Sequence, residues 1–389
     1  MDRQKVVILH SGNLNDVSPG GISEYVKQFI RYSNSDVYLL GTENKESGYK
    51  IWKEYSKSIG NKQYFFIPIN FSSRRPISLF YFISLFTFIL FNPKFWRSIK
   101  VVYAQRMEYV LPFCLLFIRK QVVMAIHGSG RYASMFWGSG IAKLYWLLEY
   151  IAIWRATKIF ILNNNSEFGV PYYKKKYNKF KNKIFYTLVP VNMDLFKPLD
   201  KDYVRKKYGF AKNEKVLLFL GRIEHNPKRV LILPDVLNSV KRMYPETRLL
   251  VVGSGSDKCL LEQELEKRHL LNDAIFIDYV KHGEGLVELI NCADVSLVCS
   301  SFEGICMSAL ESISSGIPVI ATNVGDIKEY LFDGQNGYLI DLHKDEEIIP
   351  EMSKLVINLF KRQIKVNREP INKFNAVDVI KKTESLLLG

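Results

Sequence analysis

The chain has 389 residues, 48% of them hydrophobic, and a formal net charge of +15. This composition excludes a largely disordered protein and is sufficient for two domains, each with its own core. The first apolar run, in MDRQKVVILHSG, is too short for a signal peptide, and the five cysteines show no paired metal-ligand spacing. We therefore expect small buried thiols and a cytoplasmic protein.

The charge is divided unevenly between the two halves of the chain. Residues 1–190 contain 27 Lys and Arg against 10 Asp and Glu, a net charge of +17, whereas the remainder contains 27 against 29, a net charge of −2. This asymmetry predicts an anionic partner for the first half, either a lipid surface or a nucleic acid. The absence of a helix-turn-helix, zinc-ligand or RNA-binding signature argues against nucleic acid.

Short apolar strands alternate with helical stretches along the whole chain. Strands are expected near residues 5–10, 37–41, 64–69, 101–104, 121–126, 158–162, 184–189, 215–220, 248–252, 274–280, 294–299, 317–321 and 337–341. This order predicts an α/β protein with two doubly wound parallel sheets. Because the periodicity breaks near Pro190, we expect one domain at 1–190 and a second at 191–372.

Residues 77–91 form an uncharged stretch with basic residues on both sides. A helix of this length reaches about 22 Å, short of the roughly 30 Å hydrocarbon core of a bilayer. We expect it to lie in the membrane interface, although a wholly buried helix remains the alternative. Residues 137–158 and 172–183 also mix lysines with aromatic side chains, a composition typical of a bilayer boundary.

Two acidic residues eight positions apart, Glu303 and Glu311, are the most informative feature. The apolar run 294–299 predicts a buried strand, and the helical spacing after it ends at Gly316. Glu303 is then on the loop at the carboxyl end of the strand, and Glu311 points toward it from about two turns into the helix. Helix amides suit a diphosphate and carboxylates accept hydrogen bonds from sugar hydroxyls, which predicts a sugar-nucleotide site. The alternative is a capping residue and a solvated surface residue.

Further motifs occur in order along the chain: Pro19-Gly20-Gly21-Ile22 after VVILHSG, VPVNMDLFKP at 189–198, LLFLGRIEHNPKRV at 217–230, Gly253-Ser254-Gly255, Asp333-Gly334 and Asn336-Gly337. Together with the acidic pair they resemble the retaining, nucleotide-sugar-dependent glycosyltransferases of family 4. The resemblance implies the GT-B fold, two Rossmann-like domains facing each other across a cleft, with the helix 376–388 packing back on the first domain. The chain departs from the family pattern at Phe196, one position early, at Asn226-Pro227 and at Asp326.

The resemblance also implies roles for individual residues. Arg222 and Lys228 hold the diphosphate in place of a metal ion, so no metal cofactor is expected; fixed cations stabilise the charge of a departing phosphate. Glu311 binds the ribose hydroxyls, and Glu303 binds hydroxyls of the transferred sugar. His127 matches a histidine of the family that lies close to the donor sugar. His10 is a second candidate because of its own position, at the end of the first strand near the glycine loop. The remaining donor-binding residues are Gly20, Gly21, Gly304, Ile305 and Cys306.

The predicted function is retaining transfer of a hexose-type sugar from a nucleotide sugar, with UDP as the favoured carrier, to a lipid-linked or surface polysaccharide acceptor. The enzyme is expected on the inner face of the cell membrane, held there by its basic first domain. Two alternatives stay open. One is a sugar-nucleotide epimerase of the same fold, and the other is a non-catalytic, basic membrane adaptor.

Overall fold

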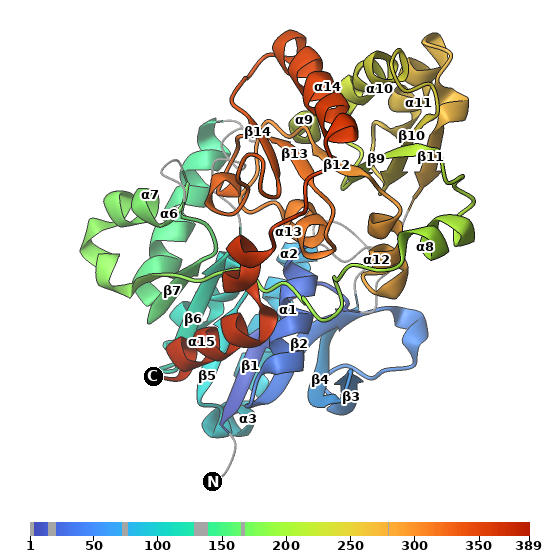
Figure 1. The fold of residues 1–389 in the computed structure, drawn as a ribbon. Coiled ribbons are helices and arrows are strands. Elements are labelled where there is room, and N and C mark those ends of the chain that lie inside the picture. The colour runs from blue at the N-terminus through green and yellow to red at the C-terminus, as the bar shows by residue number, and fades with distance from the viewer. Residues whose placement is uncertain (1–3, 15–20, 72–76, 128–138, 165–167, 279) are drawn as a thin grey trace. The chain divides into compact units, whose positions relative to one another are not determined.

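The computed structural model describes residues 4–14, 21–71, 77–127, 139–164, 168–278 and 280–389. The chain divides into two compact units (Figure 1). The first unit comprises Met1–Pro190 and Ala376–Gly389, and the second comprises Val191–Asn375. Each unit is described by itself.

The first unit is built on an eight-stranded sheet with the order β3-β4-β2-β1-β5-β6-β7-β8. Its strands are β1 (Lys5–Leu9), β2 (Asp36–Glu43), β3 (Tyr55–Ile59), β4 (Lys62–Phe71), β5 (Val101–Ala104), β6 (Gln121–Ile126), β7 (Lys158–Ile161) and β8 (Ile184–Tyr186). All neighbouring pairs are parallel except β3 and β4. The central strands are continuous apolar runs because helices cover both faces of the sheet.

The edge strand β3 was not expected from the sequence. It runs antiparallel to β4, with Ile59 opposite Lys62, so that only Gly60 and Asn61 form the turn. Gly60 has φ +57°, a conformation in which glycine is favoured. The segment Tyr55–Ile59 contains too few apolar residues to be identified as a strand, but a two-residue Gly-Asn turn is a hairpin signal that the sequence did contain.

Helices cover both faces of the first sheet. On one face, α1 (Gly21–Tyr32) and α15 (Ala376–Leu388) contribute to one apolar core. A second core lies on the opposite face under α2 (Ile77–Phe91), α3 (Pro93–Ser98), α4 (Leu111–Leu115), α6 (Ser139–Arg155) and α7 (Val170–Lys176). Short 3-10 helices follow at Lys45–Ser47, Met107–Tyr109 and Asn178–Lys183.

The last helix, α15, is fixed to the first unit by a buried carboxylate. Glu384 accepts hydrogen bonds from the Ser35 hydroxyl at 2.6 Å and from the Asn34 amide at 3.0 Å. Burial alone would raise the pKa of Glu384, but these hydrogen bonds outweigh it and lower the pKa. In Figure 1 the red α15 lies beside the blue α1 and β1. The last residues of the chain therefore complete the core of the first unit.

The second unit is built on a six-stranded, wholly parallel sheet with the order β11-β10-β9-β12-β13-β14. Its strands are β9 (Lys215–Leu220), β10 (Thr247–Val252), β11 (Ala274–Ile277), β12 (Val295–Val298), β13 (Val319–Thr322) and β14 (Gly337–Ile340). Its helices are α8 (Lys201–Lys207), α9 (His225–Lys228), α10 (Leu233–Lys241), α11 (Lys258–Lys267), α12 (Glu284–Asn291), α13 (Met307–Ser314) and α14 (Asp345–Lys361). Apolar cores lie on both faces of this sheet as well.

The cysteines follow the expectation only in part. Cys292, Cys299 and Cys306 are buried, whereas Cys114 is partly exposed and Cys259 is exposed on α11. The expectation of a buried thiol was therefore wrong for Cys259, because its position on the amphipathic α11 faces away from the core residues Leu261 and Leu265. Within the described ranges, no helix combines the length and the apolar character needed to cross a bilayer.

Candidate donor site at the carboxyl edge of the second sheet

The strand order of the second unit reverses between β9 and β12. From β9 the chain moves outward through β10 and β11, and it then returns to the other side of β9 as β12, β13 and β14. Open α/β sheets bind ligands at the carboxyl ends of the strands beside such a reversal. Arg222 and Lys228 follow β9, and Glu303 follows β12. The strand order thus brings predicted donor ligands to one edge of the sheet, although Lys228 and Glu303 are 75 positions apart in the sequence.

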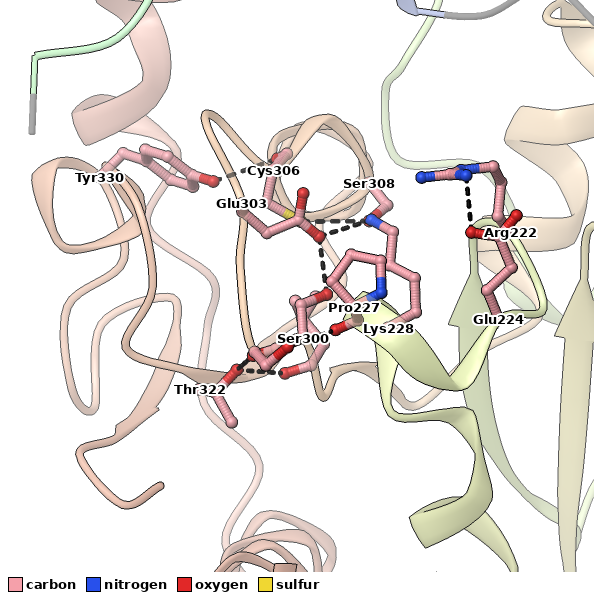
Figure 2. A network of polar contacts seen from close by, with 12 residues as sticks. Arg222, Glu224, Pro227, Lys228, Ser300, Glu303, Cys306, Ser308, Thr322 and Tyr330 are labelled. Carbon is pink, nitrogen blue, oxygen red and sulfur yellow. Dashed lines mark hydrogen bonds and ion pairs between the residues drawn. The ribbon is translucent and has the colours of Figure 1, made fainter. Parts of the chain in front are cut away.

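Lys228 and Glu303 form an ion pair at this edge. The Lys228 Nζ lies 2.5 Å from Glu303 Oε1, and their side chains are 19% and 13% exposed. The Ser300 hydroxyl donates to the same carboxylate oxygen at 2.7 Å, and Figure 2 shows the amine pointing at the carboxylate. Burial alone would lower the pKa of Lys228, but the Glu303 carboxylate outweighs it and raises the pKa. The lysine is therefore a fixed cation at neutral pH.

Backbone contacts tie the two loops together around this pair. The Ser301 amide donates to the Pro227 carbonyl at 2.8 Å, immediately before Lys228. The Thr322 hydroxyl, at the end of β13, donates to the Ser300 carbonyl at 2.5 Å (Figure 2). Three neighbouring strands thus position the ion pair. Side chains held on rigid elements keep their geometry when a ligand binds.

Two glycines permit the close approach of loops at this edge. Gly325 has φ +60°, and a Cβ there would lie 2.4 Å from the carbonyl oxygens of Glu303 and Gly304. Gly253 has φ +142°, and a Cβ there would lie 1.9 Å from the Gly221 carbonyl oxygen. Any larger residue would push apart the loops that carry Glu303 and Arg222, because a backbone atom cannot move aside as a flexible side chain can.

Arg222 is placed differently from Lys228. Its guanidinium pairs with Glu224 at 2.6 Å, and its side chain is 60% exposed. It lies close enough to Lys228 for its positive charge to reduce slightly the increase in the pKa of Lys228 that Glu303 causes. Figure 2 shows Arg222 beside the Lys228 and Glu303 pair without joining it. The site therefore contains one locked cation and one exposed cation.

The helix α13 begins at Met307, directly after the loop that contains Gly304, Ile305 and Cys306. Cys306 occupies the N-cap position and makes no side-chain capping hydrogen bond. The Tyr330 hydroxyl donates to the Cys306 carbonyl at 3.1 Å and fixes the start of the helix (Figure 2). The positive end of the helix dipole is thus presented at the same edge as the cations, which suits an anionic group.

Glu311 is the fifth residue of α13, so it lies little more than one turn into the helix rather than the two turns expected. It is buried rather than solvated, and its Oε1 lies 2.8 Å from His282 Nε2. The ring of His282 packs on Phe196 at a centroid distance of 4.9 Å. The motif residue Phe196 thus lies in an apolar core of the second unit, where it supports the imidazole that contacts Glu311.

Sequence reasoning missed His282. It follows β11, so it lies at the same carboxyl edge as the other site residues. This position directly after a predicted strand was the one sequence feature that could have identified His282 as a site residue. Its contact with Glu311 depends on the packing of β11 and α13, which are not neighbours in the chain, and no local pattern reveals it.

The first unit places its predicted residues at the carboxyl edge of its own sheet. Gly20 lies outside the described residues, and Gly21 is the first residue of α1. His10 follows β1, and its Nε2 lies 2.9 Å from the Ser23 hydroxyl. His127 follows β6, with its Nε2 2.7 Å from the Gln105 side-chain oxygen. The strand order of this sheet also reverses, between β1 and β5, so His10 lies beside the reversal and His127 lies one strand further out, after β6.

Both histidines are held in the neutral form. Burial, followed by the charge of Arg106, lowers the pKa of His10 to about 4. Burial lowers the pKa of His127 to about 3, with further contributions from His10 and Arg106. A neutral imidazole offers one donor and one acceptor nitrogen. These two side chains therefore suit hydrogen bonding to a neutral polar ligand rather than pairing with an anion.

No group of three or more His, Cys, Asp or Glu side chains is arranged to hold a metal ion in the ranges that the structure describes. The groups that can hold an anion at the carboxyl edge of the second sheet are Arg222, Lys228 and the start of α13.

Comparisons with known proteins agree with this architecture. Residues 200–368 match the family model described as glycosyl transferases group 1. Among curated proteins, N-acetyl-alpha-D-glucosaminyl L-malate synthase of Bacillus anthracis is 28% identical over 170 residues, which cover 40% of this chain and 43% of that protein. The chain thus matches about two fifths of the length of its curated relatives.

Solved structures align over the full chain. Sucrose-phosphate synthase from Thermosynechococcus elongatus aligns with a TM-score of 0.78 at 16% identity, covering 99% of this chain and 98% of that one. HepE of Anabaena, solved in complex with UDP and glucose, aligns with a TM-score of 0.71 at 13% identity, covering 99% of both chains. At these identities the alignments establish the fold alone.

The fold is that of the GT-B class, with two α/β units on parallel sheets, as the sequence predicted. Within the second unit, residues 200–368 are similar to the glycosyl transferases group 1 family.

Proposed function

We propose that the protein is a retaining, family 4-like glycosyltransferase that moves a hexose-type sugar from a UDP-sugar to a lipid-linked or surface polysaccharide acceptor in the cytoplasm. The observation that carries the proposal is the grouping of Lys228, Glu303 and Arg222 at the strand reversal of the second sheet, next to the start of α13. Cations and helix amides at one sheet edge match a diphosphate, and carboxylates match sugar hydroxyls.

Lys228 supplies the fixed positive charge in the proposed reaction. As the bond between the sugar and the diphosphate breaks, negative charge builds on the departing phosphate, and a cation already in place stabilises it. Glu303 holds the amine in position before the donor binds. Arg222, with its planar guanidinium, is free to turn from Glu224 to the diphosphate, since its side chain is largely exposed.

The carboxylates orient the donor. Glu311 is proposed to accept hydrogen bonds from the ribose hydroxyls, with His282 holding the carboxylate in place. Glu303 is proposed to hold hydroxyls of the transferred sugar. His127 is proposed to hydrogen-bond the donor sugar through its neutral imidazole. In this mechanism no side chain forms a covalent intermediate. The acceptor hydroxyl attacks the anomeric carbon from the face that the diphosphate leaves, which retains the anomeric configuration, and the departing phosphate helps to deprotonate that hydroxyl.

The choice of UDP is supported by HepE, a protein of the same fold that was solved with UDP and glucose. The choice of a lipid-linked or polysaccharide acceptor is supported by the charge of the first unit, because residues 1–190 carry +17. Such a domain favours the anionic surfaces at which lipid-linked acceptors occur.

Thermal-shift measurements with a panel of nucleoside diphosphates and nucleotide sugars test the proposal. A ligand that binds the folded state raises the Tm by an amount that follows its affinity. We expect UDP to give the largest shift among the diphosphates, without added magnesium, and Arg222→Ala and Glu311→Ala to lose both the shift and the hydrolysis of the UDP-sugar. An absolute requirement for a divalent metal would contradict the role given to the two cations.

A further inference from the structure

Three neighbouring helices of the first unit present an unusual amount of apolar surface. α4 packs against both α2 and α6 on the same face of the sheet. Phe117, just after α4, is 89% exposed, and even Tyr150 on α6 is 44% exposed. We call this surface the apolar helix face and define it by Leu79, Phe80, Ile83, Leu90, Phe91, Leu115, Phe117, Leu144, Leu147, Tyr150 and Trp154.

Helix α2 is apolar on both of its sides. One stripe, which includes Tyr81, Leu85 and Phe88, is buried against the first sheet. The opposite stripe, which includes Ile83 and Leu90, is about half exposed, and the whole helix contains no charged residue. The wholly buried helix considered as an alternative is therefore wrong. A helix with a polar outer side is the usual solution at a water-facing position, so this outer stripe indicates an apolar environment.

The end of α4 and the outer side of α6 continue the same surface. Phe117 has φ +51°, a conformation that is costly for a bulky residue and that here brings no burial. On α6, Leu147 and Trp154 are seven residues apart and each 56% exposed, so they lie on one side of the helix two turns apart. The sequence pattern had indicated α2 and α6 but not Phe117.

The charge around this face is almost entirely positive. Residues 77–190 contain 16 Lys and Arg but three Asp and Glu. Of the three, Glu108 pairs with Arg106 at 2.7 Å, Glu149 is buried with Lys176 at 3.2 Å, and Glu167 lies outside the described residues. Exposed lysines follow along α6, α7 and the 3-10 helix after it, at Lys143, Lys174, Lys175, Lys179 and Lys181.

We propose that the apolar helix face docks the protein on an anionic lipid bilayer. The apolar and aromatic side chains enter the boundary between headgroups and acyl chains, and the lysines contact lipid phosphates. A second copy of the chain is a poorer partner, because it would bring a matching set of positive charges against the first. A bilayer satisfies the apolar surface and the positive charge together.

This inference goes beyond the proposed function, since it depends on the surface of the first unit and on no donor or acceptor. It also predicts where the reaction takes place, because docking through this face would hold the enzyme at the membrane surface that carries lipid-linked acceptors.

Vesicle sedimentation tests the proposal with the full chain and no nucleotide. The face variant carries Phe117→Ser, Leu147→Ser and Trp154→Ser, all at exposed positions. The matched control carries Tyr203→Ser, Met243→Ser and Leu260→Ser, which are exposed apolar residues of the second unit. With vesicles of phosphatidylcholine and phosphatidylglycerol, we expect the face variant to lose about tenfold or more in partitioning and the control to lose less than about twofold.

The vesicle composition and the salt concentration separate the alternatives. Binding should weaken on pure phosphatidylcholine and in high salt, because the lysines act through screened charge. An unchanged UDP-induced rise in Tm verifies that the face variant is folded. If UDP does not bind, a melting curve like that of the wild type is used to verify folding instead. The proposal is overturned if the wild type does not sediment with anionic vesicles, if the face variant sediments equally, or if light scattering shows a dimer that only the face variant dissociates.

Discussion

At the carboxyl edge of its parallel sheet, the second unit pairs charged side chains, whereas the first unit places neutral imidazoles at the corresponding edge of its own sheet. In the second unit Lys228 faces Glu303, and in the first His10 and His127 are uncharged at neutral pH. The same α/β architecture thus supports two kinds of site, one suited to a diphosphate and one suited to neutral hydroxyl groups.

The outer surfaces of the units differ as well. The first unit carries +17 and the second −2, because residues 376–389 add no net charge to the first. Of the 17 large hydrophobic side chains that are exposed in the described residues, 13 lie in the first unit. We propose membrane contact for the first unit and stabilisation of the leaving group for the second, and the predictions below test each of these two proposals.

The largest effect is expected at Lys228. Lys228→Ala should lower the rate of UDP-sugar hydrolysis or transfer by about 10²–10³-fold, the usual loss when one preorganised group that stabilises developing charge is removed. The matched control is Arg229→Ala, because the neighbouring guanidinium binds the His343 carbonyl at 2.7 Å and Asp345 at 3.3 Å instead. Initial rates should fall less than about threefold in the control. Equal losses in both variants would remove Lys228 from the site.

The ion pair of the second unit should also be visible in stability. Glu303→Gln leaves the Lys228 amine largely buried without its carboxylate, which should cost about 2–3 kcal/mol in the free energy of unfolding. The double variant Lys228→Met with Glu303→Gln should recover part of that loss in urea titrations. As a control, Asp202→Asn breaks the exposed pair with Lys212 and should change stability by less than about 1 kcal/mol.

The first unit should be sensitive to acid through its neutral histidines. Because the folded pKa values of His10 and His127, about 4 and about 3, lie below the unfolded value of 6.5, the unfolded chain binds more protons below pH 6.5. Stability is therefore lost as pH falls from 6.5 toward 3, by about 2 kcal/mol per histidine between pH 6.5 and 5. The variant His10→Gln with His127→Gln should flatten this dependence of Tm on pH. An unchanged slope would show that the two imidazoles titrate normally.

The smallest effect is expected at His282, which acts as a positioning residue through Glu311. His282→Ala should raise the KM for the UDP-sugar about 5–10-fold and leave kcat within about twofold, in keeping with one lost hydrogen bond. His282→Gln, which can still donate to Glu311, should restore the KM. With a 2′-deoxy-UDP-sugar the difference in KM between the wild type and His282→Ala should shrink. If the ratio of the two KM values stays constant, Glu311 does not bind the ribose hydroxyl.

Much of the fold was visible in the sequence because its signals are local. The helices at 77–91 and 376–388 were expected with the bounds that the structure shows, since the first is an uncharged, largely apolar stretch and the second an amphipathic repeat. The strand β3 escaped detection because a half-exposed edge strand has little apolar signal. The GT-B fold followed from ordered motifs and is confirmed by the structure and the comparisons.

The sequence predicted several residues of the candidate site, but it did not predict which side chains they contact. Glu303 and Glu311 were singled out by their spacing about a predicted strand-to-helix turn, and Arg222 and Lys228 by the resemblance to family 4 glycosyltransferases. That Lys228 meets Glu303, that Glu311 meets His282 and that Arg222 stays exposed depends on the order of strands in the sheet. Strand order is set by long-range packing, and no spacing along the chain encodes it.

The sequence by itself determined the two α/β halves, the uneven charge and the residue types of the candidate donor site, because composition and periodicity are properties of neighbouring residues. Only the tertiary structure decided which cation is locked, which histidines are neutral and which apolar side chains remain outside. Those properties depend on burial and on the distance between groups remote in the chain, and burial exists only once the sheets and helices have packed.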